Sequence, residues 1–389
     1  MANAQLTRLA QQLAALKADS LLRTRRLLES PQGVRVKVDG RDVVSFCSND
    51  YLGLASDPAL IKAVQEAAAQ MGVGAGASHL ITGHHRAHQQ FEQAFAAFVG
   101  RPAALLFSTG YMASLGVIPA LLGRQGEVFA DRLNHASLND AVVLSGAKFS
   151  RYAHGSTDAL RALLERSTAR EKLIVTDTVF SMDGDLAPVD SLLELAEEFD
   201  AWLYLDDAHG FGVLGEQGQG VLNEALRTSD RVIYLATLGK GAGVFGAAVA
   251  AHETVIDWLV NRAHTYIYTT AMPPLIGAAL SESLKRIAEG DALRRQLLRH
   301  IDRLRAGLSS LRRWTLMNSD TPIQPLVIGD NAAAVAVSCQ LLERGLLVPA
   351  IRTPTVPKGT ARLRVSLSAA HTCEEVDMLV SALHELNHD

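Results

Sequence analysis

Charged side chains are scarce in this chain, and neither sign dominates. They make up 20% of its 389 residues and leave a net charge of −4. Without a basic excess, we expect neither nucleic acid nor a membrane surface as a partner. The hydrophobic share of 48% is enough for a large core, which at this length favours a major and a minor domain.

Cysteine is scarce too, and long apolar runs are missing. The three cysteines, Cys47, Cys339 and Cys373, are widely separated and lack metal-ligand spacing. We therefore expect reduced thiols in a cytoplasmic protein rather than a disulfide framework. No apolar run is long enough to span a membrane, and the leucines of residues 6–16 recur at helical spacing, which predicts an amphipathic helix rather than a signal peptide.

What the chain does contain is an alternation of apolar strands and amphipathic helices. Strands are expected at residues 34–38, 43–46, 103–107, 128–130, 148–152, 173–178, 201–205, 231–236 and 244–251. Apolar strands separated by helices indicate a mostly parallel sheet that is covered on both faces. Such a sheet binds its ligands at the carboxyl ends of its strands.

From about Pro273 the pattern changes to long helices with two short strands, at 323–328 and 361–366. This change indicates a second, smaller α+β domain. We therefore divide the chain into an N-terminal helix with short strands at 1–45, a large α/β domain at 46–272 and a small α+β domain at 273–389.

Lys240 lies in a loop of small residues directly after the expected strand 231–236, and Asp206 ends the strand before it. A lysine in an apolar cavity has a lowered pKa, and its free amine attacks carbonyl groups. A lysine that forms a Schiff base and an aspartate that pairs with a pyridinium nitrogen are what pyridoxal phosphate (PLP) needs to act as an electron sink. The alternative is an exposed surface lysine, for which flanking Gly239 and Gly241 are an unusual setting.

The same loop matches the dinucleotide-binding pattern GxGxxG at residues 241–246. That pattern requires a helix after its glycines, whereas residues 247–251 are typical of a strand. No acidic residue ends a second strand at the required distance either. We therefore exclude dinucleotide binding.

Two further segments join a strand to a helix. Residues 108–111 do so with small and hydroxylated side chains, and the free N–H groups of a helix start form a phosphate cradle. His135 also follows a strand and opens a helix. The alternatives are an ordinary helix cap for the first segment and a capping or surface histidine for the second.

The segment 83–88 contains three histidines, and the four-residue spacing of His84 and His88 raises the question of a metal site. A zinc hydrolase of this pattern needs a carboxylate between its histidines, where this chain has Arg86. We therefore expect no metal here, and a structural or cofactor-proximal role for His88.

Arginines gather near the end of the chain. Arg352 precedes a proline-rich loop, and Arg362 and Arg364 lie on one face of the expected strand 361–366. Exposed surface charge is the usual fate of arginine. A substrate carboxylate, however, calls for a planar, bidentate donor of this kind.

Seven segments carry a resemblance to a known family: 48–54 (SNDYLGL), 72–78 (GVGAGAS), 131–137 (DRLNHAS), 180–185 (FSMDGD), 206–210 (DDAHG), 237–240 (TLGK) and 351–357 (IRTPTVP). With these segments in this order, the chain resembles the α-oxoamine synthases of PLP fold type I over nearly its whole length. The resemblance implies a large domain with a mostly parallel seven-stranded sheet, a smaller α+β C-terminal domain, and a homodimer with shared active sites.

The resemblance also implies roles for single residues around PLP. Lys240 is expected to be the covalent anchor and general base, and Asp206 the partner of the ring nitrogen. His135 is expected to lie on the pyridine face, and His209 and Ser181 to reach the phenolic oxygen. The cofactor phosphate is assigned to Gly110, Tyr111, Thr237 and, from the neighbouring subunit, Thr270. Asp207 is expected to point to the other face of its strand and to be structural.

Substrate-binding residues follow from the same resemblance, and we assign them as Arg23, Asn49, Ser78, Arg352, Thr355 and Arg364. Arg364 is expected to hold the α-carboxylate of the amino acid, and Arg352 to support its loop or contact the acyl substrate. Arg23 is expected to meet the far carboxylate of the acyl chain, with Arg25 and Arg26 as close alternatives.

Within the family, the resemblance implies condensation of L-alanine with a pimeloyl thioester of CoA or acyl carrier protein, with loss of CO2. Ser78 favours alanine, because a threonine there would crowd the methyl group of the substrate. Relatives that use glycine or serine remain alternatives, as does a non-catalytic PLP carrier or a structural α/β protein. Leu238, in place of a frequent aromatic residue, and His79, in place of a frequent arginine, depart from the family pattern.

Overall fold

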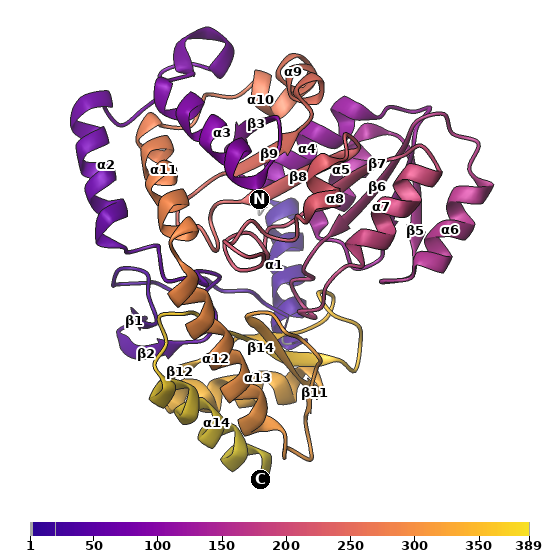
Figure 1. Ribbon diagram of the computed structural model, residues 1–389. Coiled ribbons are helices and arrows are strands. Elements are labelled where there is room, and N and C mark those ends of the chain that lie inside the picture. The colour runs from indigo at the N-terminus through magenta and orange to yellow at the C-terminus, as the bar shows by residue number, and fades with distance from the viewer. Residues whose placement is uncertain (1–2, 20, 389) are drawn as a thin grey trace. The chain divides into compact units, whose positions relative to one another are not determined.

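The computed structural model describes residues 3–19 and 21–388 (Figure 1). The contacts within the chain divide it into two compact units. The large unit comprises residues 49–181 and 185–295, and the small unit comprises Met1–Ser48, Met182–Gly184 and Gln296–Asp389.

The contacts place the division later in the chain than the expected boundary at 272/273. Helix α11 (Pro274–Ala288) follows that boundary, yet it packs against α2 (Pro58–Met71) and α3 (Arg86–Val99) of the large unit. Leu280 and Leu284 on its apolar face are buried, which explains why the helix stays with the large unit. Helix α12 (Asp291–Leu308) then carries the chain from one unit to the other.

The large unit is built on a sheet that has seven strands among the described residues, in the order β3-β9-β8-β7-β6-β4-β5. The strands are β3 (Ala103–Phe107), β4 (Glu127–Asp131), β5 (Lys148–Tyr152), β6 (Lys172–Asp177), β7 (Trp202–Asp206), β8 (Val232–Thr237) and β9 (Ala247–Ala251). The other six strands run in one direction, and β9 runs opposite to them. The predicted mostly parallel seven-stranded sheet is therefore confirmed.

Both faces of this sheet are buried. Along β7, Leu203 and Leu205 belong to one apolar cluster and Tyr204 to the other. This alternation is expected of a strand with cores on both sides. The remaining helices of the large unit are η1 (His79–Gly83), α4 (Gly110–Leu121), α5 (Ala136–Ser145), α6 (Thr157–Arg166), α7 (Val189–Glu198), α8 (Glu224–Thr228), α9 (Glu253–Arg262) and α10 (His264–Ile267).

The carboxyl ends of the parallel strands bring polar residues to one edge of the sheet. Strand β6 ends at Asp177 and β7 at Asp206, and these two residues are direct neighbours in the register. Strand β8 ends at Thr237, three residues before Lys240. Strand β9 begins at Ala247 rather than at Val244 as expected, because Gly246 has a φ of 103° that interrupts an extended chain.

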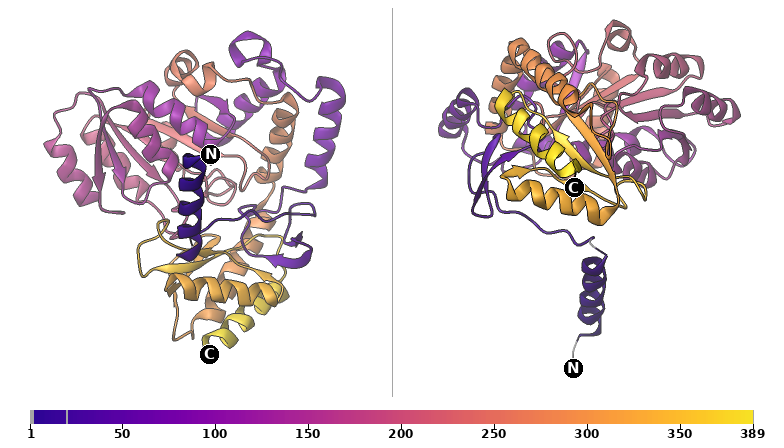
Figure 2. Two further views of the ribbon diagram at one scale, coloured as in Figure 1. Left: turned by 180° about the vertical axis from the view of Figure 1, so that it is seen from behind. Right: turned by 90° about the horizontal axis from the view of Figure 1, so that it is seen from below.

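The small unit is an α+β unit, as expected. Among the described residues it has a three-stranded sheet (β1-β2-β12) and a four-stranded sheet (β10-β11-β14-β13). The strands are β1 (Arg35–Val38), β2 (Arg41–Ser45), β10 (Thr315–Leu316), β11 (Ile323–Gly329), β12 (Leu346–Leu347), β13 (Ala350–Ile351) and β14 (Ala361–Ser366). The helices are α1 (Ala4–Ala18), α13 (Asn331–Glu343) and α14 (Cys373–His388) (Figure 2).

Helix α1 has the predicted amphipathic pattern but buries none of its residues. Leu6, Leu9 and Leu13 are all largely exposed. Within residues 3–19 and 21–388, no helix combines the length and the apolar character needed to cross a membrane.

Candidate active site

Lys240 lies in a tight loop between β8 and β9. The loop is closed by hydrogen bonds from Leu238 N to Gly246 O (2.8 Å) and from Gly243 N to Lys240 O (2.8 Å). A side chain at Gly241 would place its Cβ 2.5 Å from Phe211 O. Gly243 has a φ of 67°, which disfavours other residues. The glycines therefore let the loop pack directly against neighbouring backbone and leave Lys240 half-buried at the sheet edge.

A chain of hydrogen bonds runs from Lys240 into the core of the large unit. Lys240 Nζ lies 3.0 Å from His209 Nε2, and His209 Nδ1 lies 2.6 Å from the hydroxyl of Tyr51. The Tyr51 hydroxyl also donates to Asn49 Oδ1 (3.1 Å). Tyr51 is fully buried. The structure thus joins three predicted site residues, Lys240, His209 and Asn49, through a tyrosine that the sequence analysis did not assign.

Two buried carboxylates lie beside Lys240. Burial raises the pKa of Asp206 to about 6, although the positive charge of Lys240 opposes this shift. Burial, and next the charge of Asp206, raise the pKa of Asp177 well above its usual value. Asp177 and Asp206 are direct partners in the strand register. The negative charge of one carboxylate therefore disfavours ionisation of the other. A cationic ring nitrogen next to Asp206 would favour the ionised form of that carboxylate.

His135 is held in place by Asp177. Its backbone N–H donates to Asp177 Oδ2 (2.6 Å), and its ring caps α5, where Nδ1 accepts from the backbone N–H of Ser137 (3.3 Å). Partial burial of the ring and the nearby charge of Lys240 lower the pKa of His135. Both effects favour the neutral form of the ring. Asp177 was not assigned from the sequence, although it ends β6 just as Asp206 ends β7.

The start of α4 forms the other side of the site. Thr109 caps the helix by accepting from Met112 N (3.1 Å), so the amides of Gly110 and Tyr111 remain at the open helix start. A Cβ on Gly110 would lie 2.8 Å from Thr237 Oγ1. The Gly110 backbone and the Thr237 hydroxyl therefore face one narrow space. Such a space suits a phosphate group.

The other predicted residues of the large unit differ in burial. Tyr111 is exposed, and its hydroxyl donates to the carboxylate of Asp140. Ser78 and Ser181 are half-buried, and Thr270 is exposed. Asp207 is fully buried and accepts hydrogen bonds from Thr178 Oγ1, Tyr234 OH and Val221 N, so it stabilises the loop after β7.

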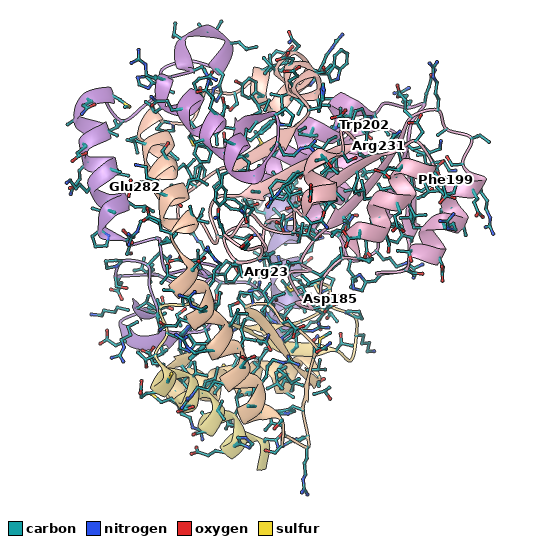
Figure 3. All side chains as sticks on the ribbon, in the orientation of Figure 1. Arg23, Asp185, Phe199, Trp202, Arg231 and Glu282 are labelled. Atoms are coloured by element: carbon teal, nitrogen blue, oxygen red, sulfur yellow. The ribbon has the colours of Figure 1, made fainter. Side chains whose placement is uncertain are left out.

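Four predicted substrate residues belong to the small unit. Arg23, Arg352 and Thr355 line one cavity of about 630 Å³, together with leucines of residues 13–22. Arg23 is labelled in Figure 3. Arg25 and Arg26 do not line this cavity. Arg364 is buried and donates to Ser366 Oγ (2.8 Å).

Arg362, the neighbour of Arg364 on β14, is engaged elsewhere. Its guanidinium is paired with Asp183 and donates to Met182 O (3.2 Å) and Thr360 O (3.0 Å). Asp183 and Met182 lie in the short segment that belongs to the small unit. Arg362 therefore fixes that segment.

The histidines of residues 79–88 form a real cluster. His79, His84 and His88 each bring a ring nitrogen within 4.8 Å of the others. His88 Nδ1, however, accepts a hydrogen bond from His85 N (3.1 Å), so the proton of the neutral ring is on Nε2. His88 Nε2 is buried and has no hydrogen-bond partner among the described residues, so it is the nitrogen of this ring that remains available. The expectation that no metal binds here stays a prediction.

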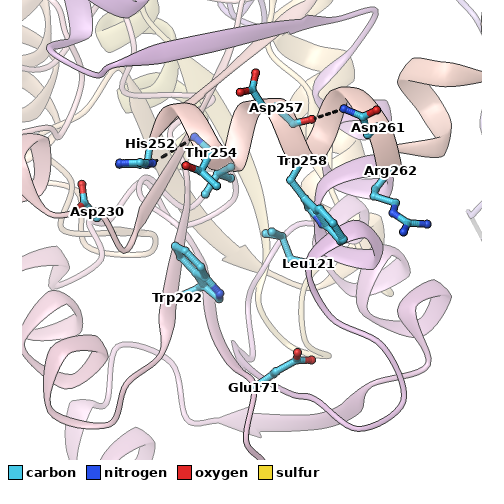
Figure 4. A pocket seen from close by; sticks show the side chains of 11 residues that line it. Leu121, Glu171, Trp202, Asp230, His252, Thr254, Asp257, Trp258, Asn261 and Arg262 are labelled. Carbon is cyan, nitrogen blue, oxygen red and sulfur yellow. Dashed lines mark hydrogen bonds between the residues drawn. The ribbon is translucent and has the colours of Figure 1, made fainter.

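A larger cavity, of about 980 Å³, lies at the opposite edge of the sheet (Figure 4). Trp202, at the start of β7, and Trp258, on α9, line it. Trp202 lies near Arg231 at the amino ends of β7 and β8 (Figure 3). None of the residues that line this cavity is among those predicted for the active site. Cavity volume therefore does not identify the candidate active site in this protein.

Comparisons with known proteins identify the family of this chain. The family model for class I and II aminotransferases matches residues 41–383. A curated 8-amino-7-oxononanoate synthase from Thiobacillus denitrificans is 63% identical over 99% of this chain and 100% of its own length. A relative of the same name from Herminiimonas arsenicoxydans is 58% identical over 96% of this chain and 98% of its own.

Solved structures are similar over the same length. A high-resolution structure of SPT with a PLP internal aldimine has a TM-score of 0.92 and 28% identity, covering 99% of this chain and 98% of that one. An 8-amino-7-oxononanoate synthase from Francisella tularensis has a TM-score of 0.76 and 31% identity, covering 89% and 97%. The chain therefore belongs to the class I and II aminotransferase family and, within it, to the 8-amino-7-oxononanoate synthases.

Proposed function

We propose that this protein condenses L-alanine with a pimeloyl thioester to give 8-amino-7-oxononanoate, CO2 and the free thiol carrier, a step of biotin biosynthesis. The proposal rests mainly on sequence identity: curated 8-amino-7-oxononanoate synthases are up to 63% identical to this chain over nearly their full length. Lys240, His209 and Asp206, gathered at one edge of the sheet, support it independently.

PLP is the cofactor, and the large unit has the groups to hold it. The amine of Lys240 would hold the cofactor aldehyde, and Asp206 would pair with the ring nitrogen. The open start of α4 and the Thr237 hydroxyl would receive the phosphate. When bound, the cofactor supplies an electron sink for the bond-breaking at Cα of the amino acid.

Lys240 is the general base in this proposal. As a free amine, Lys240 Nζ would take the Cα proton of L-alanine and later return one to the product. His209 Nε2, 3.0 Å away, holds the amine in position. His135, kept in place by Asp177, would cover one face of the cofactor ring.

The small unit supplies the carboxylate-binding groups. We assign the α-carboxylate of alanine to Arg364, whose neighbour Arg362 is occupied by Asp183. The cavity with Arg23, Arg352 and Thr355 suits the acyl chain, because apolar walls match its methylene groups and arginine matches its far carboxylate. Asn49 and Ser78 belong to the amino acid side of the site.

We further propose a homodimer, in which Thr270 contacts the phosphate in the site of the other subunit. A hydrogen bond from Ala271 N to Ala77 O (2.9 Å) joins the segment of Thr270 to that of residues 73–81. Val73, Ile81 and Tyr268 in these segments are largely exposed, so a second copy would bury an apolar surface here. The three free cysteines suit the cytoplasm as its compartment.

The test is an assay of the purified protein with L-alanine and either pimeloyl-CoA or pimeloyl-acyl carrier protein. We expect a product with the mass of 8-amino-7-oxononanoate and none with Lys240→Ala. The carrier that supports the higher kcat/KM identifies the natural thioester. A higher kcat/KM with glycine than with alanine would replace the proposal by a glycine-using relative of the family.

A further inference from the structure

Tyr51 is the residue of the active site that neither the sequence analysis nor the proposed function assigns. It lies in the turn that joins the short β-structure of the small unit to α2, and it is fully buried. Asp50 fixes this turn, because its carboxylate accepts from Leu54 N (2.8 Å) and Ala55 N (3.0 Å). The Tyr51 hydroxyl is therefore rigidly placed against the His209 ring.

Counting hydrogens gives the direction of each bond in the chain. A tyrosine hydroxyl has one hydrogen, and Tyr51 donates it to Asn49 Oδ1, an amide oxygen that only accepts. Toward His209 Nδ1, 2.6 Å away, the Tyr51 oxygen is then the acceptor. His209 consequently has its proton on Nδ1, and its Nε2 offers a lone pair to Lys240 Nζ, 3.0 Å away.

We propose that Tyr51 is a positioning residue that selects the Nδ1-protonated tautomer of His209 and so presents Nε2 as a hydrogen-bond acceptor to the Lys240 amine. The same hydroxyl orients the amide of Asn49, whose Oδ1 faces Tyr51 and whose NH2 group points away from it. The buried Tyr51 hydroxyl thus orients two groups. One is the His209 ring beside Lys240, and the other is the Asn49 amide on the amino acid side of the site.

This arrangement has a consequence for proton movement at Lys240. An N–H of the lysine donates to Nε2, and an ammonium group at Lys240 has a base at hydrogen-bond distance to receive its proton. When that proton moves, the N–H bond of Lys240 breaks, an N–H bond forms at Nε2, and the ring becomes a cation whose Nδ1–H still donates to Tyr51. Lys240 is left as the neutral amine that its chemistry requires.

The direct test uses the full-length protein without cofactor, with its histidines labelled with ¹⁵N, and reads the tautomer of His209 by NMR. His209→Asn identifies the signal. We expect the wild type to have its proton on Nδ1, and Tyr51→Phe to shift the proton toward Nε2. Tyr204→Phe is the matched control, since Tyr204 is equally buried and its hydroxyl bonds only Ser114 (3.3 Å) among the hydrogen bonds described. A wild-type proton on Nε2, or no change in Tyr51→Phe, would overturn the proposal.

A kinetic test rests on the proposed function. It separates the positioning role of Tyr51 from the proposed reaction itself. We expect Tyr51→Phe to lower kcat with L-alanine about tenfold while its PLP content stays that of the wild type. In a His209→Asn background, the same change should lower kcat by clearly less than tenfold, because the part of its effect that passes through His209 is already lost. An equal loss in both backgrounds would contradict the proposal. If no variant turns over alanine, the proposed function fails, and the NMR result still decides the tautomer.

Discussion

Glu92 and His154 both have raised pKa values, for opposite reasons. Glu92 on α3 is buried, and burial raises its pKa to about 7, although Oε1 accepts from Leu106 N (2.8 Å). His154 donates to Asp131 (3.0 Å) and Asp185 (2.7 Å), and these bonds raise its pKa to about 10. At pH 7 the carboxyl is therefore half-protonated and the imidazole is a cation. Single side chains in the large unit thus make its stability depend on pH.

The first prediction concerns Glu92→Gln. Between about pH 4.5 and 7 the folded state binds more protons at Glu92 than the unfolded state, so its stabilising contribution is full below about 4.5 and is lost as the pH rises through about 7. Glutamine keeps the acceptor for Leu106 N and has no charge. We expect the variant to lose less stability than the wild type between pH 5 and 8, by up to roughly 3 kcal/mol.

Urea unfolding at the two pH values measures this difference, with both proteins at one concentration. The exposed Glu194→Gln is the control and should behave as the wild type. Equal pH dependence in wild type and Glu92→Gln would show that Glu92 is ionised normally in the fold.

The second prediction is that Lys240→Ala lowers alanine-dependent release of the thiol carrier by at least about a thousandfold, because both the covalent anchor and the general base are lost. The fold should survive, since the Lys240 side chain is only half-buried. Circular dichroism checks the fold, and the thiol released is measured with a colorimetric reagent. Residual turnover within tenfold of wild type would remove Lys240 from its proposed role.

At the scale of secondary-structure elements, the start of α4 is the part of the fold that prepares the phosphate site. The third prediction is that Gly110→Ala weakens PLP binding about tenfold, because the new Cβ would lie 2.8 Å from Thr237 Oγ1 and narrow the space at the helix start. Gly123→Ala is the matched control, since nothing lies within 4 Å of its Cβ. Titration of cofactor-free protein with PLP, followed by absorbance, gives both dissociation constants. Equal constants would mean that the phosphate binds elsewhere.

The elements also show what the sequence predicts and what it leaves open. Strands β3, β5 and β14 have the expected bounds, because each is an apolar or alternating run between clear breaks. The two-residue strands β10, β12 and β13 were not expected. Strand β12 pairs with β2, about three hundred residues earlier in the chain, and no local pattern indicates such a partner.

In the candidate site, too, some residues are predictable from the sequence and others are not. Lys240, Asp206 and His209 were predicted because each follows an apolar strand and therefore falls at the ligand-binding edge of the sheet. Tyr51 lies in a turn, and its partner His209 is 158 residues away in the sequence. Its role depends on a contact that only the folded chain reveals, although the segment 48–54 was among those that carry the family resemblance.

At the scale of the whole molecule, the fourth prediction is that two inactive variants restore activity when mixed. In a dimer with shared sites, a Lys240→Ala subunit and a Thr270→Asp subunit together form one intact site, while the other site has both defects. Random mixing should recover roughly a quarter of wild-type activity, because half of the dimers are hybrids with one working site. The assay follows thiol release after the mixture is unfolded and refolded together.

The control mixes Lys240→Ala with the double variant Lys240→Ala, Thr270→Asp, which offers no intact site in any combination and should stay inactive. Recovery in this control would point to a contaminating enzyme. No recovery in the test mixture, with hybrids present by mass spectrometry, would mean that Thr270 acts within its own subunit or not at all.

The most direct test of the proposed reaction is the fate of the alanine carboxylate. With L-[1-¹³C]alanine and a pimeloyl thioester, we expect ¹³CO2 and free thiol in equal amounts, and no ¹³CO2 when the thioester is omitted. This stoichiometry separates decarboxylative condensation from amino-group transfer, which would convert the labelled alanine to pyruvate with its carboxylate retained. Labelled pyruvate, or thiol release without ¹³CO2, would contradict the account.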